Sequence, residues 1–337
     1  MPKRDIIVIG ASAGGVEATM RLCAGLPADL DAAVFLVQHV SPSARSLMAQ
    51  LLNRSGPLPA LSPSDGQNIE PGHIYVAGPD HHLLLRPGRI LMRRGPQENR
   101  VRPSVNALFR SAAVAYGARV IGLVLTGLLD DGTDGLIAIK AAGGYSLVQD
   151  PEDAEWPSMP RNAVRRDHVD KVAPLHKLPA VLVELSQTEA PPTVPLPPDY
   201  AIEDKIAAEE FAVMSPAIVT PGQPSFMSCP DCGGVLNVID VDGQSRFRCQ
   251  VGHAFSSLGL AEAQTVELER ALAVAIRTHR DRIKLFQQMS DSASARRLPH
   301  AVSRWQEARR EAEGMIFALE QAAAQLRRMP APEDMAE

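Results

Sequence analysis

The segment from Asp5 to Ala18, DIIVIGASAGGVEA, places a serine in a glycine-rich turn directly after an apolar run. Ser12 has small neighbours on both sides, and this G-x-S-x-G pattern is typical of a strand-to-helix turn that exposes a nucleophilic hydroxyl. Glycines after a strand also suit a loop that binds a cofactor phosphate. A dinucleotide site, however, needs glycine where Ser12 stands. Glycine-rich turns between a strand and a helix are common, so the segment by itself leaves both uses open.

A histidine and a group of aspartates follow two later apolar runs. The run AVFLVQH ends in Gln38 and His39, where a dinucleotide site would have an acidic residue. Because the carboxyl ends of parallel strands meet at one edge of a sheet, His39 is expected beside Ser12 as a general base. The loop after residues 120–126 contains Asp130, Asp131 and Asp134. One of these carboxylates would orient the imidazole, and the alternative for the loop is a solvated turn or a metal site.

The order serine, histidine, aspartate along the chain differs from the order serine, aspartate, histidine of α/β-hydrolases. That fold is therefore disfavoured, although the G-x-S-x-G pattern is shared with it.

A second group of reactive side chains lies near the other end of the chain. Cys229 and Cys232 form a C-x2-C pair, and Cys249 and His253 follow after sixteen residues as C-x3-H. Four such ligands on two short turns are typical of a closed, structural zinc site, and the alternative is three buried cysteines with an unrelated histidine. Arg246 and Arg248 would form only a modest basic patch, so we expect protein docking or stapling by this module and no binding of nucleic acid.

Apolar patterning gives the elements that must position these side chains. Short apolar runs alternate with helical patterns up to about residue 186, which predicts an α/β, doubly wound, mostly parallel sheet with an antiparallel hairpin turned at Arg86-Pro87-Gly88-Arg89. The predicted strands are 6–9, 34–37, 74–76, 83–85, 90–92, 120–126 and 145–148, and the predicted helices are 16–26, 43–53, 105–116 and 136–142.

The remainder of the chain differs in composition. We expect a catalytic domain over residues 1–186, an extended proline-rich linker over 187–225, a zinc-ribbon-like module over 226–256 turned at Asp242-Gly243, and an α-helical hairpin over 257–328. In the hairpin, apolar residues that include Leu268 recur on one helical face, and a breaker at 290–299 separates two antiparallel helices.

Composition limits the possible functions. The 337 residues carry a net charge of −5, and 45% are apolar but only 4% aromatic. The negative net charge argues against a dedicated nucleic-acid-binding protein, which needs a basic surface. No apolar run has the length of a transmembrane helix and the N-terminus lacks signal-peptide features, so we expect a cytoplasmic protein without membrane insertion. Three of the four cysteines cluster, which is not a disulfide framework.

Five motifs in this order and spacing, IGASAGG, VQH, RPSVNALF, LTGLLDDGTDG and QDPEDAEWPSMPRNAV, strongly resemble the catalytic domain of the chemotaxis protein-glutamate methylesterases over residues 5–186. The resemblance implies hydrolysis of glutamyl methyl esters on the cytoplasmic helices of methylated chemoreceptors, or on another methylated protein, with related deamidation of glutamine and no catalytic cofactor. An alternative is a signalling interaction protein that keeps a vestigial esterase fold and docks through its zinc-ribbon tail.

The resemblance also implies roles for individual residues. Ser12 would be the nucleophile, His39 its general base and Asp131 the residue that orients His39. The backbone N–H groups of Ala13 and Leu128 would stabilise the oxyanion. Residues 102–104 (Arg102, Pro103 and Ser104), together with a Met159-Pro160 turn, would line the substrate groove or serve the structure.

Three departures from the family pattern leave the substrate and its regulation open. The family usually carries an N-terminal receiver domain, whereas this sequence starts at the first catalytic strand, so regulation by phosphorylation within the chain is not expected. Ala13 stands where many relatives have threonine, and Gly127-Leu128-Leu129 stands in place of G-M-G.

Overall fold

The computed structural model describes residues 2–43, 46–166, 169–210, 221–241 and 244–330. Within them, seven strands form a sheet in the order β3-β4-β2-β1-β7-β8-β9, and every neighbouring pair is parallel. A separate antiparallel hairpin joins β5 (His82–Arg86) to β6 (Arg89–Arg93). The predicted fold class of the catalytic part is thereby confirmed. The strands of the sheet are β1 (Ile6–Ala11), β2 (Ala33–Gln38), β3 (Ala60–Leu61), β4 (Ile74–Val76), β7 (Val120–Val124), β8 (Tyr145–Gln149) and β9 (Lys171–Ala173).

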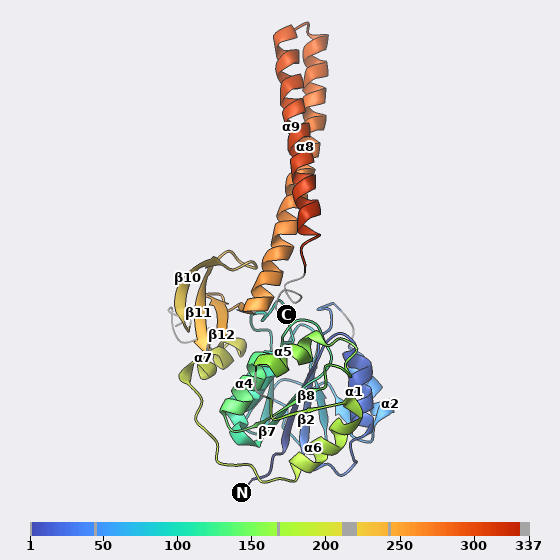
Figure 1. Cartoon of the computed structure of the whole chain (residues 1–337), viewed down its shortest axis with the longest axis vertical. Helices are drawn as coiled ribbons and strands as arrows, with labels where there is room; N and C mark the ends of the chain where they lie inside the picture. The colour runs from blue at the N-terminus through green and yellow to red at the C-terminus, as the bar shows by residue number, and fades with distance from the viewer. Residues whose placement is uncertain (1, 44–45, 167–168, 211–220, 242–243, 331–337) are drawn as a thin grey trace. The chain divides into compact units, whose positions relative to one another are not determined.

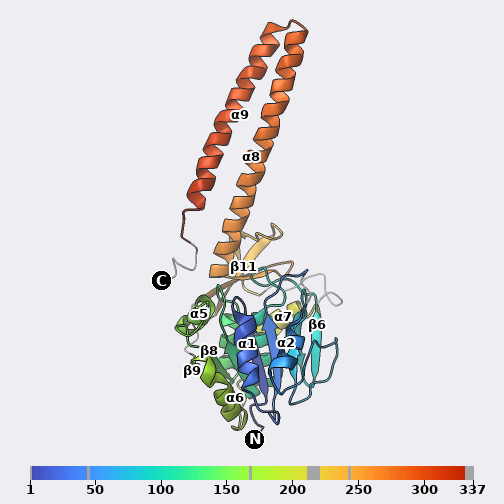
Figure 2. The same ribbon diagram turned by 90° about the vertical axis from the view of Figure 1, so that its right-hand side faces the viewer.

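Helices cover both faces of this sheet (Figures 1 and 2). Side chains alternate along a strand, so in β1 Ile7 and Ile9 enter one buried cluster while Ile6 and Val8 enter the other. The first cluster is completed by α1 (Gly15–Ala24), α2 (Met48–Ser55) and α6 (Leu178–Ser186). The second is completed by the hairpin and by α3 (Val105–Tyr116), α4 (Thr133–Ala141) and α5 (Ser158–Arg166). Short 3₁₀ helices lie at Gly117–Arg119 and Leu175–Lys177.

The seven predicted strands are all present, but part of the helix prediction is wrong. Of the predicted helix 43–53, residues 44–45 lie outside the described residues, and α2 begins only at Met48. The predicted Met159-Pro160 turn is the first turn of α5. Proline is compatible with that position because the first N–H groups of a helix have no partner within the helix. The short strands β3 and β9 and the helices α5 and α6 were not predicted.

The predicted extended linker contains a helix, α7 (Pro198–Ala207). Its first proline precedes Tyr200, whose side chain is buried in the second cluster of the sheet. Glu203 and Asp204 on the same helix are also buried. The proline-rich composition misled the prediction, because proline at the start of a helix is as favourable as proline in an extended chain.

A ribbon of four described strands follows, in the antiparallel order β10-β11-β12-β13. The two predicted strands correspond to β11 (Val235–Val241) and β12 (Gln244–Cys249), and the predicted turn at Asp242-Gly243 lies outside the described residues. The outer strands β10 (Gln223–Ser228) and β13 (Ala254–Ser256) were not anticipated.

Ion pairs between the ribbon, α7 and α3 are buried. Arg248 Nη2 lies 3.2 Å from Glu98 Oε1 and 3.1 Å from Glu203 Oε1, and each of these three side chains is at most 4% exposed. Arg110 pairs with Glu98, and Arg246 with Glu203. Burial alone would raise the pKa of Glu98, but the charges of Arg110 and Arg248 hold that pKa well below its usual range. The prediction of a basic surface patch is therefore wrong, because Arg246 and Arg248 are buried and form ion pairs with glutamates inside the unit.

The chain divides into two compact units, residues 1–260 and 261–337. The second consists of most of α8 (Ser257–Ala295) and of α9 (Pro299–Leu326), which run side by side in Figures 1 and 2. The rings of Phe286 and Trp305 stack across the pair at 5.7 Å. The predicted breaker is too long, since α8 continues to Ala295, and Leu268 of the predicted inner face is 55% exposed. None of the described helices is long and apolar enough to cross a bilayer.

The buried ion pairs give a prediction about stability. Arg248→Ala leaves Glu98 and Glu203 short of a buried partner, so we expect it to destabilise the first unit by about 3–5 kcal/mol. Lys3→Ala removes an exposed pair with Asp31 in the same unit and should cost no more than about 1 kcal/mol. Urea unfolding followed by Trp156 fluorescence in a Trp305→Phe background measures both. Equal effects of the two substitutions would contradict the prediction.

Candidate active site

Ser12 lies in the turn between β1 and α1. Its N–H donates to the Thr126 carbonyl at 3.0 Å, and its own carbonyl accepts from the Gly15 N–H at 3.0 Å. Gly14 has φ +70°, a left-handed conformation that glycine adopts without a steric cost. A Cβ at Gly10 would lie 2.2 Å from Val105 Cγ1, so glycine there allows β1 and α3 to approach. The glycines therefore serve the turn and its packing.

His39 directly follows β2 and extends the strand pairing, because its N–H donates to the Ala11 carbonyl at 3.0 Å. Its Nδ1 lies 3.2 Å from Ser12 Oγ, and its Nε2 lies 2.8 Å from Asp131 Oδ2. A carboxylate can only accept, so the ring proton belongs on Nε2 and Nδ1 is left to accept from the Ser12 hydroxyl. The structure thus brings the three predicted residues into one hydrogen-bonded series.

Asp131 is held by the N-terminus of α3. The backbone N–H groups of Val105 and Asn106 donate to its carboxylate at 2.7 and 3.1 Å, and Ser104 Oγ donates at 3.1 Å. The side chain of Asp131 is only 5% exposed, so these donors replace water as its partners. The first N–H groups of a helix are unpaired and carry partial positive charge, which suits a buried carboxylate.

The loop from Gly127 to Gly132 is fixed at several further points. Asn106 Oδ1 accepts from the N–H groups of Gly132 and Gly135, both at 2.9 Å. Leu129 has φ +61°, a conformation that is costly for leucine, and the structure holds it there through bonds from the Asn162 and Ser158 side chains to its carbonyl. The departure from G-M-G therefore keeps the backbone conformation that glycine would adopt.

Asp130 is buried beside Asp131. Its Oδ2 accepts from Arg166 at 2.8 Å, and its Oδ1 accepts from Ser256 Oγ at 2.8 Å. Burial, reinforced by the nearby carboxylate of Asp134, raises the pKa of Asp130 to about 7.

Two backbone donors next to Ser12 have no acceptor within the described residues. They are the N–H groups of Ala13 and Leu128, the predicted oxyanion donors. Leu128 belongs to the loop that contacts the serine, since a Cβ at Gly127 would lie 2.9 Å from Ser12 Cβ. Free donors beside a nucleophile are what a developing oxyanion requires.

The predicted groove residues have different surroundings. Met159 is buried against Gly127, close to Ser12. Arg102 instead bonds Asp80 at 2.6–2.9 Å and backbone carbonyls, and no contact described in the structure joins it to Ser12. Ser104 is fully buried and caps α3, so it serves Asp131 and does not line a groove.

Sequence reasoning missed Gln38 and Asn106 as positioning residues. Gln38 Nε2 donates to the Ser12 carbonyl at 2.7 Å and to the His39 carbonyl at 3.2 Å. Gln38 adjoins His39 in the VQH motif, and Asn106 lies in RPSVNALF. Both residues therefore lie in motifs that had been singled out from the sequence. The sequence does not show, however, which group a polar side chain in such a motif will bond.

The geometry suits acyl transfer. A serine hydroxyl within reach of a histidine, the histidine oriented by a buried carboxylate, and two free N–H donors are the parts that esterases and amidases use.

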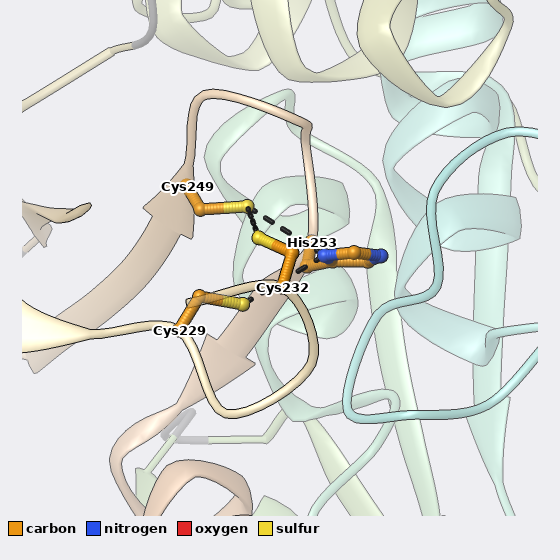
Figure 3. A group of neighbouring side chains, drawn as sticks. All are labelled: Cys229, Cys232, Cys249 and His253. Atoms are coloured by element: carbon orange, nitrogen blue, oxygen red, sulfur yellow. Dashed lines mark hydrogen bonds between the residues drawn. The ribbon is translucent and has the colours of Figure 1, made fainter. Parts of the chain in front are cut away.

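The second group of reactive side chains also comes together (Figure 3). The ligand atoms of Cys229, Cys232, Cys249 and His253 all lie within 4.8 Å of one another. Cys232 and Cys249 Sγ are 3.7 Å apart, and His253 Nδ1 is 3.6–3.7 Å from the sulfurs of Cys249 and Cys229. Tetrahedral Zn²⁺ at ordinary bond lengths would separate such ligands by about 3.5–3.8 Å. The cluster is compatible with a structural metal.

Comparisons with known proteins agree with this geometry. A family profile described as CheB methylesterase matches residues 7–182. The protein-glutamate methylesterase/protein-glutamine glutaminase 1 of Geobacter metallireducens is 40% identical over 178 residues, which are 52% of this chain and 49% of that protein. A putative protein-glutamate methylesterase/protein-glutamine glutaminase of Leptospira interrogans is 34% identical over 184 residues, 54% of this chain and 95% of that protein.

A solved structure extends the comparison to the fold. The crystal structure of the Thermotoga maritima CheB methylesterase catalytic domain matches with a TM-score of 0.52 and 31% identity, covering 54% of this chain and 98% of that domain. The chain spans about half the length of the Geobacter relative, and the family match ends before the ribbon.

The hydrogen-bonded series predicts how Ser12 reacts. Asp131→Asn would favour the wrong tautomer of His39, so labelling of Ser12 by a fluorophosphonate should slow by roughly 10³–10⁴-fold. Asp150→Asn, at the end of β8 on the same sheet edge, is the matched control and should label at the original rate. Equal labelling rates for both variants would contradict the assigned geometry.

Proposed function

This chain belongs to the CheB methylesterase family, and on that basis we propose that it is a protein-glutamate methylesterase. It hydrolyses glutamyl methyl esters on the helices of methylated chemoreceptors, releasing methanol and restoring the glutamate carboxylate. The observation that carries the proposal is the continuous series from Ser12 Oγ through the imidazole of His39 to the buried carboxylate of Asp131.

The first half of the reaction forms an acyl-enzyme. Ser12 Oγ attacks the ester carbonyl while His39 Nδ1 takes the hydroxyl proton. Asp131, accepting from Nε2, holds the ring in place and stabilises the imidazolium. The oxyanion accepts from the N–H groups of Ala13 and Leu128.

The second half releases the products. The tetrahedral intermediate expels methoxide, which takes the proton from Nδ1 and leaves as methanol, so that the glutamyl group is esterified to Ser12. Water then attacks this ester, giving its proton to Nδ1, and the free glutamate and the Ser12 hydroxyl are regenerated. A glutamine side chain would react in the same way with ammonia as the leaving group, which gives the related glutaminase activity.

Two exposed apolar side chains beside the site support a macromolecular substrate. Leu128 and Trp156 are each 42% exposed. Trp156 lies close to Gly14, two residues after Ser12, because a Cβ at that glycine would be 3.0 Å from Trp156 Cδ1. Exposed apolar groups beside a reactive serine suit contact with the surface of a helix.

Methanol release from a methylated receptor tests the proposal. Ser12→Ala should lower the rate at least roughly 10³-fold, because the acyl-enzyme can no longer form. Leu268→Ala, an exposed position in the helical unit, is the control and should keep the original rate.

Equal release by the original protein and by Ser12→Ala would overturn the catalytic assignment. It would favour the alternative of an interaction protein with a vestigial esterase fold. Release from another methylated protein but not from a receptor would keep the chemistry and change the substrate.

We further propose that Cys229, Cys232, Cys249 and His253 bind one structural Zn²⁺. Three of the ligand separations, at 3.6–3.7 Å, are compatible with a tetrahedral site, and four protein ligands leave no open position for catalysis. The N–H of Gly233 donates to the Cys229 carbonyl and that of Gly252 to the Cys249 carbonyl, so each ligand pair sits on a tight turn. The metal would stabilise a ribbon whose own apolar core is small.

Metal analysis tests this site. We expect one zinc per chain in the purified protein and its loss in Cys229→Ser. Cys23→Ser, which removes a buried cysteine of the catalytic part, is the control and should retain the zinc. Purified protein that is folded and free of metal would contradict the proposal.

A further inference from the structure

The ribbon reaches the loop that contains Asp131. Ser256, the last residue of β13, donates its hydroxyl to Asp130 Oδ1 at 2.8 Å, and both side chains are buried. Asp130 is the chain neighbour of Asp131. A residue from beyond the family's catalytic region thus bonds directly to the loop that supplies the third member of the series.

The same edge of the ribbon pairs with the segment that precedes α3. The Asn99 N–H donates to the Ala254 carbonyl at 2.7 Å, and the Ala254 N–H donates to the Gln97 carbonyl at 3.2 Å. The Ser256 N–H donates to Asn99 Oδ1 at 2.9 Å. Since Ser104, Val105 and Asn106 follow this segment and bind Asp131, the ribbon also contacts the chain that supplies those donors.

Buried ion pairs define how the ribbon sits on the catalytic part. Arg248 bridges Glu98, beside the paired segment, and Glu203 of α7. An unpaired charge at this depth is costly, so these pairs favour the placement of the ribbon in which Arg248 bridges the two carboxylates. The cavity among these side chains measures about 10 Å³, too small for a substrate, which indicates a structural contact.

We propose that the ribbon is a positioning element for Asp131, with Ser256 as its principal contact. By holding Asp130 on one side and Asn99 on the other, Ser256 fixes the two segments between which the Asp131 carboxylate is bound. The proposal rests on the proposed function for the reaction whose rate it affects, whereas the geometry of the His39–Asp131 bond is a separate observable.

The position of the Cys/His cluster links this contact to the fold of the ribbon. Arg248 immediately precedes Cys249, and Ala254 immediately follows His253. The residues that dock on the catalytic part are therefore adjacent to two of the four cluster residues, and a ribbon that loses its fold loses the docking contacts with it.

Two glycine substitutions test the proposal with little change to the backbone. Ser256 also accepts from the Gly259 N–H as the cap of α8, and glycine is nearly as good at a helix cap, so Ser256→Gly removes chiefly the bond to Asp130. Asn99 has φ +49°, which glycine adopts freely, so Asn99→Gly removes the side-chain acceptor alone. Ser257→Gly is the matched control, because Ser257 is exposed and, among the described residues, its hydroxyl bonds only the Ser245 carbonyl of the ribbon.

Two readouts are measured on each variant: the kcat and KM of methanol release, and the proton resonance of His39 Nε2–H in the histidine-labelled protein. We expect Ser256→Gly and Asn99→Gly to lower kcat about tenfold with KM nearly unchanged, since a misplaced catalytic group slows the reaction without touching the substrate. The His39 resonance should shift in both variants and remain in place in Ser257→Gly. Zinc content verifies that the ribbon is intact.

The proposal would be overturned if the His39 resonance and the kcat of both glycine variants equalled those of the unsubstituted protein. A loss of rate with an unchanged resonance and a raised KM would overturn it as well, because the ribbon would then act on substrate binding. If the original protein releases no methanol at all, the proposed function fails, and the His39 resonance alone decides whether the ribbon positions Asp131.

Discussion

The buried carboxylate of Asp131 is the constraint around which the catalytic part is arranged. A charge that is hidden from water needs donors in its place, and the N-terminus of α3 provides two backbone N–H groups and the Ser104 hydroxyl. This brings α3 against β1, which is possible only because Gly10 has no side chain. Oδ2, which accepts from the Val105 N–H, also accepts from His39 Nε2, so the orientation of the imidazole follows from the way its buried partner is held.

Buried charge also determines how the ribbon and α7 join the catalytic part. Glu98, Glu203, Arg110 and Arg248 are each at most 3% exposed, and their ion pairs form where the ribbon, α7 and the segment from Glu98 to α3 meet. A buried ion pair adds little to stability when compared with apolar packing, but it penalises every other arrangement strongly. The cluster therefore accounts for a specific placement of the ribbon, which an apolar contact would define less sharply.

Much of the candidate site could be predicted from local sequence. Ser12, His39 and Asp131 each follow an apolar strand, and parallel strands bring such positions to one edge of the sheet. The spacing of the cysteines and His253 likewise anticipated their meeting. Prediction was incomplete where a partner is remote: a groove or a structural role was left open for Ser104, which caps α3. Arg246 and Arg248 were expected in a modest surface patch, although they pair with the buried Glu98 and Glu203.

The sequence by itself determined five strands of the parallel sheet, the hairpin, the turn that holds Ser12 and the group of residues that could react, because periodicity and glycine placement act over a few neighbours. Only the tertiary structure decided which donors satisfy Asp131, that α7 is a helix packed through Tyr200, and that Ser256 bonds Asp130. The Ser256–Asp130 bond alone joins residues 126 positions apart. Their energies depend on burial, and burial exists only once the whole unit has folded.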